Sequence, residues 1–151
     1  MLYPKANAAR TVLDLSGIWE FNLKGDGNWQ NIAVPASYND QNADPAFRKY
    51  AGISVYRTKI TVPRTFAGQR IILRFDAVAH NARVCLNGHE ICTHRGGYLP
   101  FEAEITDLLA PGETGELTVE ADNRINHSTL PIGTEGATAF FGSDNPGILS
   151  V

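Results

Sequence analysis

The sequence RVCLNGHEICT, residues 83–93, gives the clearest signal of local structure in this 151-residue chain. Two short runs of alternating apolar and polar residues flank Asn87-Gly88. Asn-Gly between such runs is the strongest short-range signal for a two-residue hairpin turn. The stretch therefore predicts an antiparallel β-hairpin with strands at 83–86 and 90–93.

The hairpin carries both cysteines of the chain, one on each strand. A two-residue turn pairs Cys85 with Glu90 and Arg83 with Cys92, because the turn fixes the register of the strands. The cysteines are then diagonal neighbours about 7–8 Å apart. Since that separation is at or beyond the reach of an unstrained disulfide, we expect two reduced thiols.

Alternation with a period of two recurs on both sides of the hairpin and predicts further half-buried strands. Trp19 falls on the apolar face of the first of them and is expected in the core. Pro35 and Pro63 each end a strand, and Pro35 favours an edge position. The strands expected besides the hairpin are 18–23, 32–34, 53–62, 69–75, 101–105 and 117–121.

Two stretches lack this alternation. Residues 36–52 are polar and predict a long ordered loop, which is more often functional than idle. Residues 106–109 favour one helical turn with Thr106 as its cap. About eight short strands without a long helix predict an all-β, antiparallel sandwich of the jelly-roll type and argue against a parallel α/β sheet.

The charge and composition of the chain exclude several functional classes. The net charge of −3 is mild and gives no electrostatic reason to bind nucleic acid or an anionic membrane. No apolar run approaches the roughly 20 residues that span a bilayer, and the first residues contain no signal-peptide stretch. We expect one domain over 1–151 in the cytoplasm, with secretion left open. Residues 146–151 resemble a turn entering a new strand, which predicts truncation from a longer protein.

The histidines and cysteines do not suggest a metal site. His89 and His94 are an odd number of residues apart, so on one strand they point to opposite sides. His80 and His127 add no recognisable ligand spacing. Two cysteines without a nearby third ligand are also a poor zinc site. We expect no metal and no cofactor.

One pair of carboxylates could carry acid–base chemistry. Glu102 and Glu104 are at positions i and i+2, so they share one face of a strand. Phe101, Ala103 and Ile105 take the opposite, inner face, which leaves the glutamates in solvent. We therefore interpret both glutamates as surface residues and expect no catalytic residue in the chain.

Aromatic side chains are better candidates for sugar recognition, because a flat ring can cover the C–H face of a sugar. One tryptophan follows a glycine-rich turn, and three tyrosines fall in loops. The alternative is that each ring packs over the end of the sandwich or against a neighbouring domain. The candidate platforms are Trp29, Tyr38, Tyr50 and Tyr98.

Six further stretches bear on the family of the chain: LSGIWEF (15–21), VPASYNDQ (34–41), KYAG (49–52), VYR (55–57), AGQRIILRFDAV (67–78) and HRGGYLPFE (94–102). In this order and at this spacing they resemble the N-terminal domain of glycoside hydrolase family 2 enzymes of the β-glucuronidase type. The resemblance covers nearly the whole chain. The stretch PASYNDQ favours the glucuronidase branch over the galactosidase and mannosidase branches.

The resemblance implies a galactose-binding-like jelly roll, followed in the parent enzyme by an immunoglobulin-like sandwich and a (β/α)8 barrel. The barrel would supply the two glutamates of retaining hydrolysis, beyond Val151. The implied role is a non-catalytic sugar-binding or scaffolding domain of a homo-oligomeric enzyme that hydrolyses terminal β-D-glucuronosides. Two alternatives stay open: a free-standing carbohydrate-binding module, and a purely structural domain for interdomain or oligomer contacts.

The chain departs from the family in the loop that the resemblance places nearest the substrate. The family has an acidic residue before a pair of phenylalanines, where this chain has Ala139 before Phe140 and Phe141. An insertion could bring Asp144 into the acidic position instead. Two adjacent aromatics in an irregular stretch also suggest contact with the missing barrel. We expect these four residues to form a substrate loop or an interdomain contact.

Overall fold

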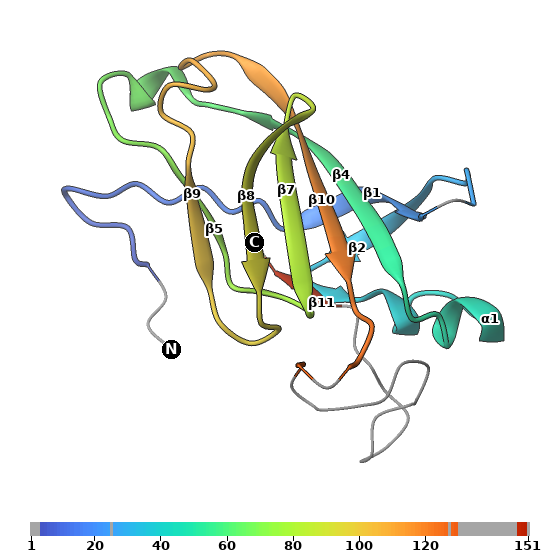
Figure 1. Ribbon diagram of the computed structural model, residues 1–151. Coiled ribbons are helices and arrows are strands. Elements are labelled where there is room, and N and C mark those ends of the chain that lie inside the picture. Colours follow the sequence, from blue (N-terminus) through green and yellow to red (C-terminus); the bar gives the residue numbers. More distant parts are fainter. Residues whose placement is uncertain (1–3, 25, 127, 130–147, 151) are drawn as a thin grey trace.

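Six strands form the larger layer of the protein in a computed structural model that describes residues 4–24, 26–126, 128–129 and 148–150 (Figure 1). All neighbouring strands in this layer are antiparallel. Their order is β2 (Gln30–Val34), β1 (Gly17–Leu23), β4 (Ile53–Thr61), β10 (Thr114–Asp122), β7 (Asn81–Leu86) and β8 (His89–Arg95).

A second, interrupted layer completes the sandwich. It contains one group of three strands and one pair, and β5 leads into β6 through Asp76 alone. These strands are β3 (Ala36–Ser37), β11 (Ile148–Ser150) and β6 (Ala77–Val78), then β5 (Ile72–Phe75) and β9 (Phe101–Glu104). Of the eleven strands in the described residues, eight are four residues or longer, so the prediction of an antiparallel sandwich with about eight strands is confirmed.

The core lies between the two layers and is built by the inward-facing residues of the alternating segments. Trp19 and Phe21 come from β1, Leu117 and Val119 from β10, and Phe75 from the opposite layer, and all five are buried. The alternate positions of the same strands face outward and are mostly polar. Burial of this apolar surface is the dominant favourable term in folding. None of the described helices has the length and apolar character that crossing a bilayer requires.

The hairpin at 81–95 has the predicted turn but a different register beyond it. Asn87 and Gly88 have φ values of 50° and 79°, as a two-residue turn of this kind needs. Cys85 pairs with Glu90, as expected, but a β-bulge then brings Cys92 opposite Val84. The predicted pairing of Arg83 with Cys92 is therefore wrong.

The bulge has a packing reason. The extra residue, Ile91, lets two consecutive side chains of β8, Ile91 and Cys92, pack against the core. Cys85 is buried and Cys92 is half-buried, both as free thiols, and burial raises the pKa of the Cys92 thiol. The bulge also changes the relative orientation of the two histidines of β8. His89 lies opposite Leu86 and His94 opposite Ala82, and these two partners are on the same side of β7. The two histidines therefore share one side of the strand, and the prediction that they point to opposite sides is wrong.

Residues 36–52 contain more structure than the predicted loop. They include β3, the 3-10 turn η1 (Tyr38–Asp40) and the one-turn helix α1 (Pro45–Arg48), which Figure 1 shows at one end of the sandwich. The Asp44 carboxylate caps α1 by accepting a hydrogen bond of 2.8 Å from the Ala46 amide. Two aromatic residues of this segment, Tyr38 and Phe47, are buried in the core.

The hydroxyl of Tyr38 connects this segment to the larger sheet. It donates a hydrogen bond of 2.7 Å to the carbonyl of Tyr50 and accepts one of 2.7 Å from Asn123 Nδ2. Asn123 Oδ1 in turn accepts from the Gly52 amide at 2.8 Å. Burial raises the pKa of Tyr38 to about 12, so the hydroxyl keeps its proton and its role as a donor at neutral pH.

We expect the substitution Tyr38→Phe to lower the free energy of unfolding by about 1–3 kcal/mol, because it removes two buried hydrogen bonds and keeps the ring. Urea unfolding followed by circular dichroism measures the change. The control is Tyr98→Phe, in which the altered ring is exposed; we expect a change within about 0.5 kcal/mol. Equal midpoints for the two variants would contradict the role of the Tyr38 hydroxyl.

Candidate functional site

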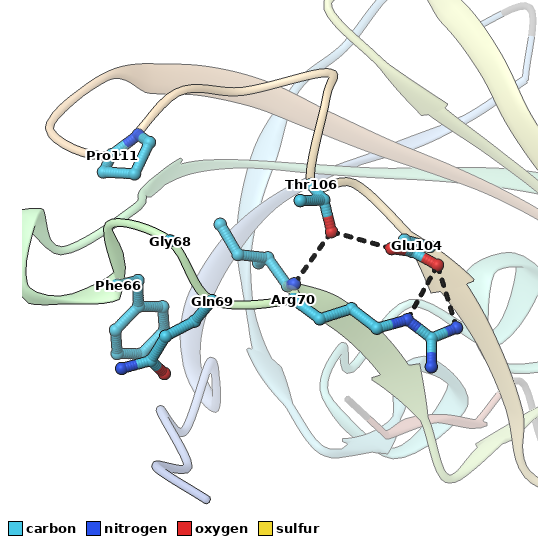
Figure 2. Close-up of a pocket in the computed structure, with 8 residues that line it drawn as sticks. Phe66, Gly68, Gln69, Arg70, Glu104, Thr106 and Pro111 are labelled. Atoms are coloured by element: carbon cyan, nitrogen blue, oxygen red, sulfur yellow. Dashed lines mark hydrogen bonds and ion pairs between the residues drawn. The ribbon is translucent and has the colours of Figure 1, made fainter.

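A pocket of about 320 Å³ opens at one end of the interrupted layer (Figure 2). The chain enters it after the 3-10 turn η2 (Arg64–Phe66), passes along the start of β5, and returns after the end of β9. Figure 2 shows the guanidinium of Arg70 and the carboxylate of Glu104 pointing toward each other. The lining residues are Phe66, Gly68, Gln69, Arg70, Ile71, Glu104, Thr106 and Pro111.

Arg70, Glu104 and Thr106 are joined by hydrogen bonds within this pocket. Glu104 accepts hydrogen bonds from Arg70 Nε at 2.9 Å and from the Thr106 hydroxyl at 2.9 Å. The Thr106 hydroxyl itself accepts from the Ile71 amide at 3.0 Å. The side chain of Thr106 thus takes the place of a strand partner for Ile71, and β5 begins only at Ile72 instead of the predicted residue 69. The predicted turn at 106–109 is present, because the amides of Leu108 and Leu109 both donate to the Ile105 carbonyl. The capping role predicted for Thr106 is wrong, because its hydroxyl bonds Ile71 and Glu104 instead.

This arrangement keeps the carboxyl group ionised. The hydrogen bond from Arg70, followed by the one from Thr106, holds the pKa of Glu104 below its ordinary value. Retaining glycoside hydrolysis needs one protonated carboxylic acid and one carboxylate about 5–5.5 Å apart. Glu104 is the one carboxylate in the lining of this described pocket, and it is paired. The pocket therefore contains an ion pair and lacks the protonated carboxyl group that retaining hydrolysis needs.

The neighbouring glutamate has the same kind of partner. Glu102 accepts a hydrogen bond of 3.0 Å from Arg74, which also bonds Asp76 at 3.1 Å. Both glutamates are exposed on β9. Ala103 between them is buried, which confirms the predicted division of this strand into an inner and an outer face.

A larger groove of about 880 Å³ runs between the N-terminal segment and the same end of the sandwich. Val12 and Leu13 of that segment and Ile72 of β5 are large apolar residues that stay exposed along it. The charged residues of the groove include the ion-paired Arg74 and Glu102. The groove thus combines exposed apolar residues with the ion pair of Arg74 and Glu102, which suits contact with another surface better than it suits catalysis.

The structure separates the four predicted aromatic platforms. Tyr38 has 0% exposure, so its ring has no free face, and the prediction for this residue is wrong because the ring is needed in the core. Tyr50 is half-buried, its hydroxyl donates to the Ile53 carbonyl at 3.1 Å, and its ring covers Gly52, where a Cβ would lie 2.5 Å from the Tyr50 hydroxyl. Tyr50 is thus also a packing residue.

The other two rings remain accessible but lie at opposite edges of the six-stranded sheet. Trp29 precedes β2 and is 44% exposed, and Tyr98 follows β8 and is 54% exposed. Their role in binding sugar stays a prediction. The structure adds a residue that sequence reasoning missed: the guanidinium of Arg57 stacks 4.0 Å from the centre of the Trp29 ring. Only the pairing of β1 with β2 and β4 could have shown this contact, since the residues are far apart in the sequence.

The predicted substrate-loop or interdomain residues Ala139, Phe140, Phe141 and Asp144 lie outside the described residues, so their roles stay predictions. Within the described ranges, no group of three or more histidine, cysteine, aspartate or glutamate residues has the arrangement of a metal site.

Comparison with known proteins identifies a family and several relatives of the chain. The family model "Glycosyl hydrolases family 2, sugar binding domain" matches residues 7–130. The chain is 39% identical over 146 residues to a β-glucuronidase of Paenibacillus borealis, in an alignment that covers 88% of this chain and 24% of the relative. It is 32% identical over 140 residues to a β-glucuronidase of Streptococcus agalactiae, covering 88% of the chain and 23% of the relative. The chain thus spans about a quarter of the length of these curated relatives.

Solved structures give the same result. A β-glucuronidase of Faecalibacterium prausnitzii superposes with a TM-score of 0.85 at 52% identity, covering 97% of this chain and 27% of that one. The β-glucuronidase of Bifidobacterium dentium complexed with coumarin-3-O-glucuronide superposes with a TM-score of 0.83 at 46% identity, covering 96% and 25%.

We expect Arg70→Gln to raise the pKa of the Glu104 carboxyl toward the ordinary value for glutamate, because it removes the main donor to the carboxylate. A carboxyl-detected NMR titration measures the pKa. A lowered pKa in the folded state contributes stability above the unfolded pKa, and the contribution is lost as the pH falls through the folded pKa. The stability difference between wild type and Arg70→Gln should therefore shrink on acidification.

The matched control is Arg48→Gln, which alters an exposed arginine of α1. An equal effect of the two variants on the pKa of Glu104 would contradict the role assigned to Arg70.

Proposed function

The chain belongs to the glycosyl hydrolases of family 2 through its sugar binding domain, and we propose that it serves as the non-catalytic sugar-binding and scaffolding domain of a β-glucuronidase-like enzyme. The reaction of that enzyme would be the retaining hydrolysis of terminal β-D-glucuronosides. Support comes from the match over residues 7–130 and from β-glucuronidases that share the fold, one of them at 52% identity.

The pairing of Glu104 with Arg70 is the observation that carries the non-catalytic part of the proposal. A glycosidase must hold one carboxyl group protonated at its working pH so that it can protonate the leaving oxygen. Arg70 does the opposite, because it lowers the pKa of Glu104. Glu102 also forms an ion pair, with Arg74 at 3.0 Å. The catalytic glutamates would then belong to a part of the enzyme outside these 151 residues.

The scaffolding part of the proposal rests on the exposed apolar residues of the groove. Val12, Leu13 and Ile72 lie along one concave surface instead of being scattered singly. Contiguous apolar surface of this kind usually marks contact with another domain or subunit. Downstream domains of the enzyme, or a second subunit of a homo-oligomer, are the partners that we propose for it.

A free-standing carbohydrate-binding module is the second candidate, and the exposed ring of Trp29 favours it. Isothermal titration calorimetry of the chain with phenyl β-D-glucuronide and with xylan fragments tests this candidate. A free-standing module must give saturable heat on its own, so the absence of such heat rules the module out. Self-association in size-exclusion chromatography without any sugar binding supports a purely structural domain instead.

We expect the purified chain to release no 4-nitrophenol from 4-nitrophenyl β-D-glucuronide above the rate in buffer, because its described carboxylates near the pocket are paired with arginine. Absorbance at neutral pH over several hours measures the release, with a β-glucuronidase as the positive control. Glu102→Gln and Glu104→Gln are prepared in the same way to reveal contaminating activity, which would be equal in all samples. Hydrolysis by the wild-type chain that either substitution abolishes would refute the non-catalytic role.

A further inference from the structure

Trp29 lies on the outer face of the six-stranded sheet, the face turned away from the core. Its ring stacks on Arg57, which alternates along β4 with the buried Tyr56 and therefore points outward. Trp29 is 44% exposed and takes no part in the hydrophobic core, unlike Trp19, which is 2% exposed. Core packing therefore does not account for the large ring of Trp29 at this position.

The turn before Trp29 is held in one shape by a compact set of hydrogen bonds. Asn22 Nδ2 donates to Asp26 Oδ1 and to the Asn28 carbonyl, each at 2.7 Å. Asp26 Oδ1 also accepts from the Asn28 amide at 2.7 Å. Asn22 is itself buried beneath this turn. The backbone that leads into Trp29 is thus fixed before any ligand arrives, which lowers the entropic cost of binding.

The Arg57 guanidinium stacks on one face of the indole at 4.0 Å from the ring centre, and the residue still keeps 44% exposure. The face opposite Arg57 is the one on which a ligand would stack. Stacking on arginine also fixes the orientation of the ring. Among the described residues, no hydrogen bond involves the indole Nε1, so this donor stays available at the edge of the ring.

The groups around the ring are polar and balanced in charge. Arg57 bonds Glu20 at 2.8 Å and lies 3.9 Å from Glu116, and both carboxylates are about half exposed. By register, Asn31 lies opposite Glu20 and Lys59 opposite Glu116, and both are exposed. Because two carboxylates already neutralise Arg57, an anionic sugar would find no unpaired arginine here.

We propose that Trp29 is the platform of a carbohydrate-binding site for an uncharged pyranose unit on the outer face of the six-stranded sheet. The C–H face of the sugar covers the face of the indole opposite Arg57, and the hydroxyl groups on the outer side of the sugar stay in water. This inference rests on the sugar-binding part of the proposed function and gives it a place and a ligand class. It does not depend on whether the chain is catalytic.

The two tryptophans of the chain make the test direct, because Trp29 is exposed and Trp19 is buried. Acrylamide quenching of tryptophan fluorescence is measured while xylotetraose or cellotetraose is added to the chain. At least one of these neutral sugars should protect Trp29 from quenching in a saturable way, with a dissociation constant of roughly 0.1–10 mM, as expected for a small stacked ligand. Tetragalacturonate, the anionic match in length, should bind at least about tenfold more weakly, because Arg57 is already paired with carboxylates and does not compensate the desolvation of the sugar's own carboxylates.

Variants separate the platform from the fold. Trp29→Ala should abolish the protection, and the emission of Trp19 reports that the core is intact. Trp29→Phe, which keeps a smaller ring, should retain weakened binding, and Tyr98→Ala, which removes an exposed ring elsewhere, should bind as the wild type does. The double variant Glu20→Gln, Glu116→Gln should narrow the difference between neutral and anionic sugars, because it leaves the charge of Arg57 uncompensated.

Three results would overturn the inference: no protection by either neutral sugar, binding of tetragalacturonate as tight as that of the neutral sugars, or undiminished binding by Trp29→Ala. Failure here and failure of the proposed function are separate outcomes. The first is a loss of the fluorescence effect, and the second is hydrolysis of the glucuronide by the chain.

Discussion

A buried cluster of aromatic rings packs the polar segment 36–52 against the six-stranded sheet, and the position of this end of the sandwich depends on that contact. The ring of Phe21 lies 5.2 Å from that of Tyr38 and 4.9 Å from that of Tyr56, and Tyr38 packs edge-on against Phe47 at 5.6 Å. These rings bring together β1, β4 and the polar segment 36–52. Asn123, just after β10, joins them through the Tyr38 hydroxyl. Because interiors are close-packed, none of these parts can shift alone.

The sequence predicted the parts of the fold whose signal is local. The alternating pattern located β1, β4, β9 and β10, and Asn87-Gly88 located the hairpin. Contacts between distant residues could not be predicted in this way. Nothing around Val84 signals the bulge, because the bulge arises from the space that the core offers to Ile91 and Cys92. Tyr38 and Phe47 were hidden for the same reason, since a polar segment without a period gives no hint of which rings turn inward.

At the candidate sites, too, the sequence predicted exposure but did not predict which distant residues would be in contact. The exposure of Glu102 and Glu104 followed from their position on an alternating strand. Their arginine partners did not, because Arg70 and Arg74 reach them only through the pairing of β5 with β9. Exposed ion pairs of this kind add little to stability. The consequence for Glu104 is chemical, because the hydrogen bond from Arg70 lowers the pKa of this carboxyl and so disfavours the protonated state that acid catalysis requires.

The two faces of the six-stranded sheet carry different constraints. The inner face packs against the opposite layer, so the volume of each of its side chains is constrained. A larger side chain there would force the layers apart. The outer face has no such partner within the described residues, and its polar ladder of Glu20, Arg57 and Glu116 stays in water. A ring as large as that of Trp29 can lie over this ladder without disturbing the core. The groove shares no side chain with Trp29 or with this ladder. The two proposed roles, contact with another domain and an aromatic surface for a sugar, therefore do not compete for the same residues.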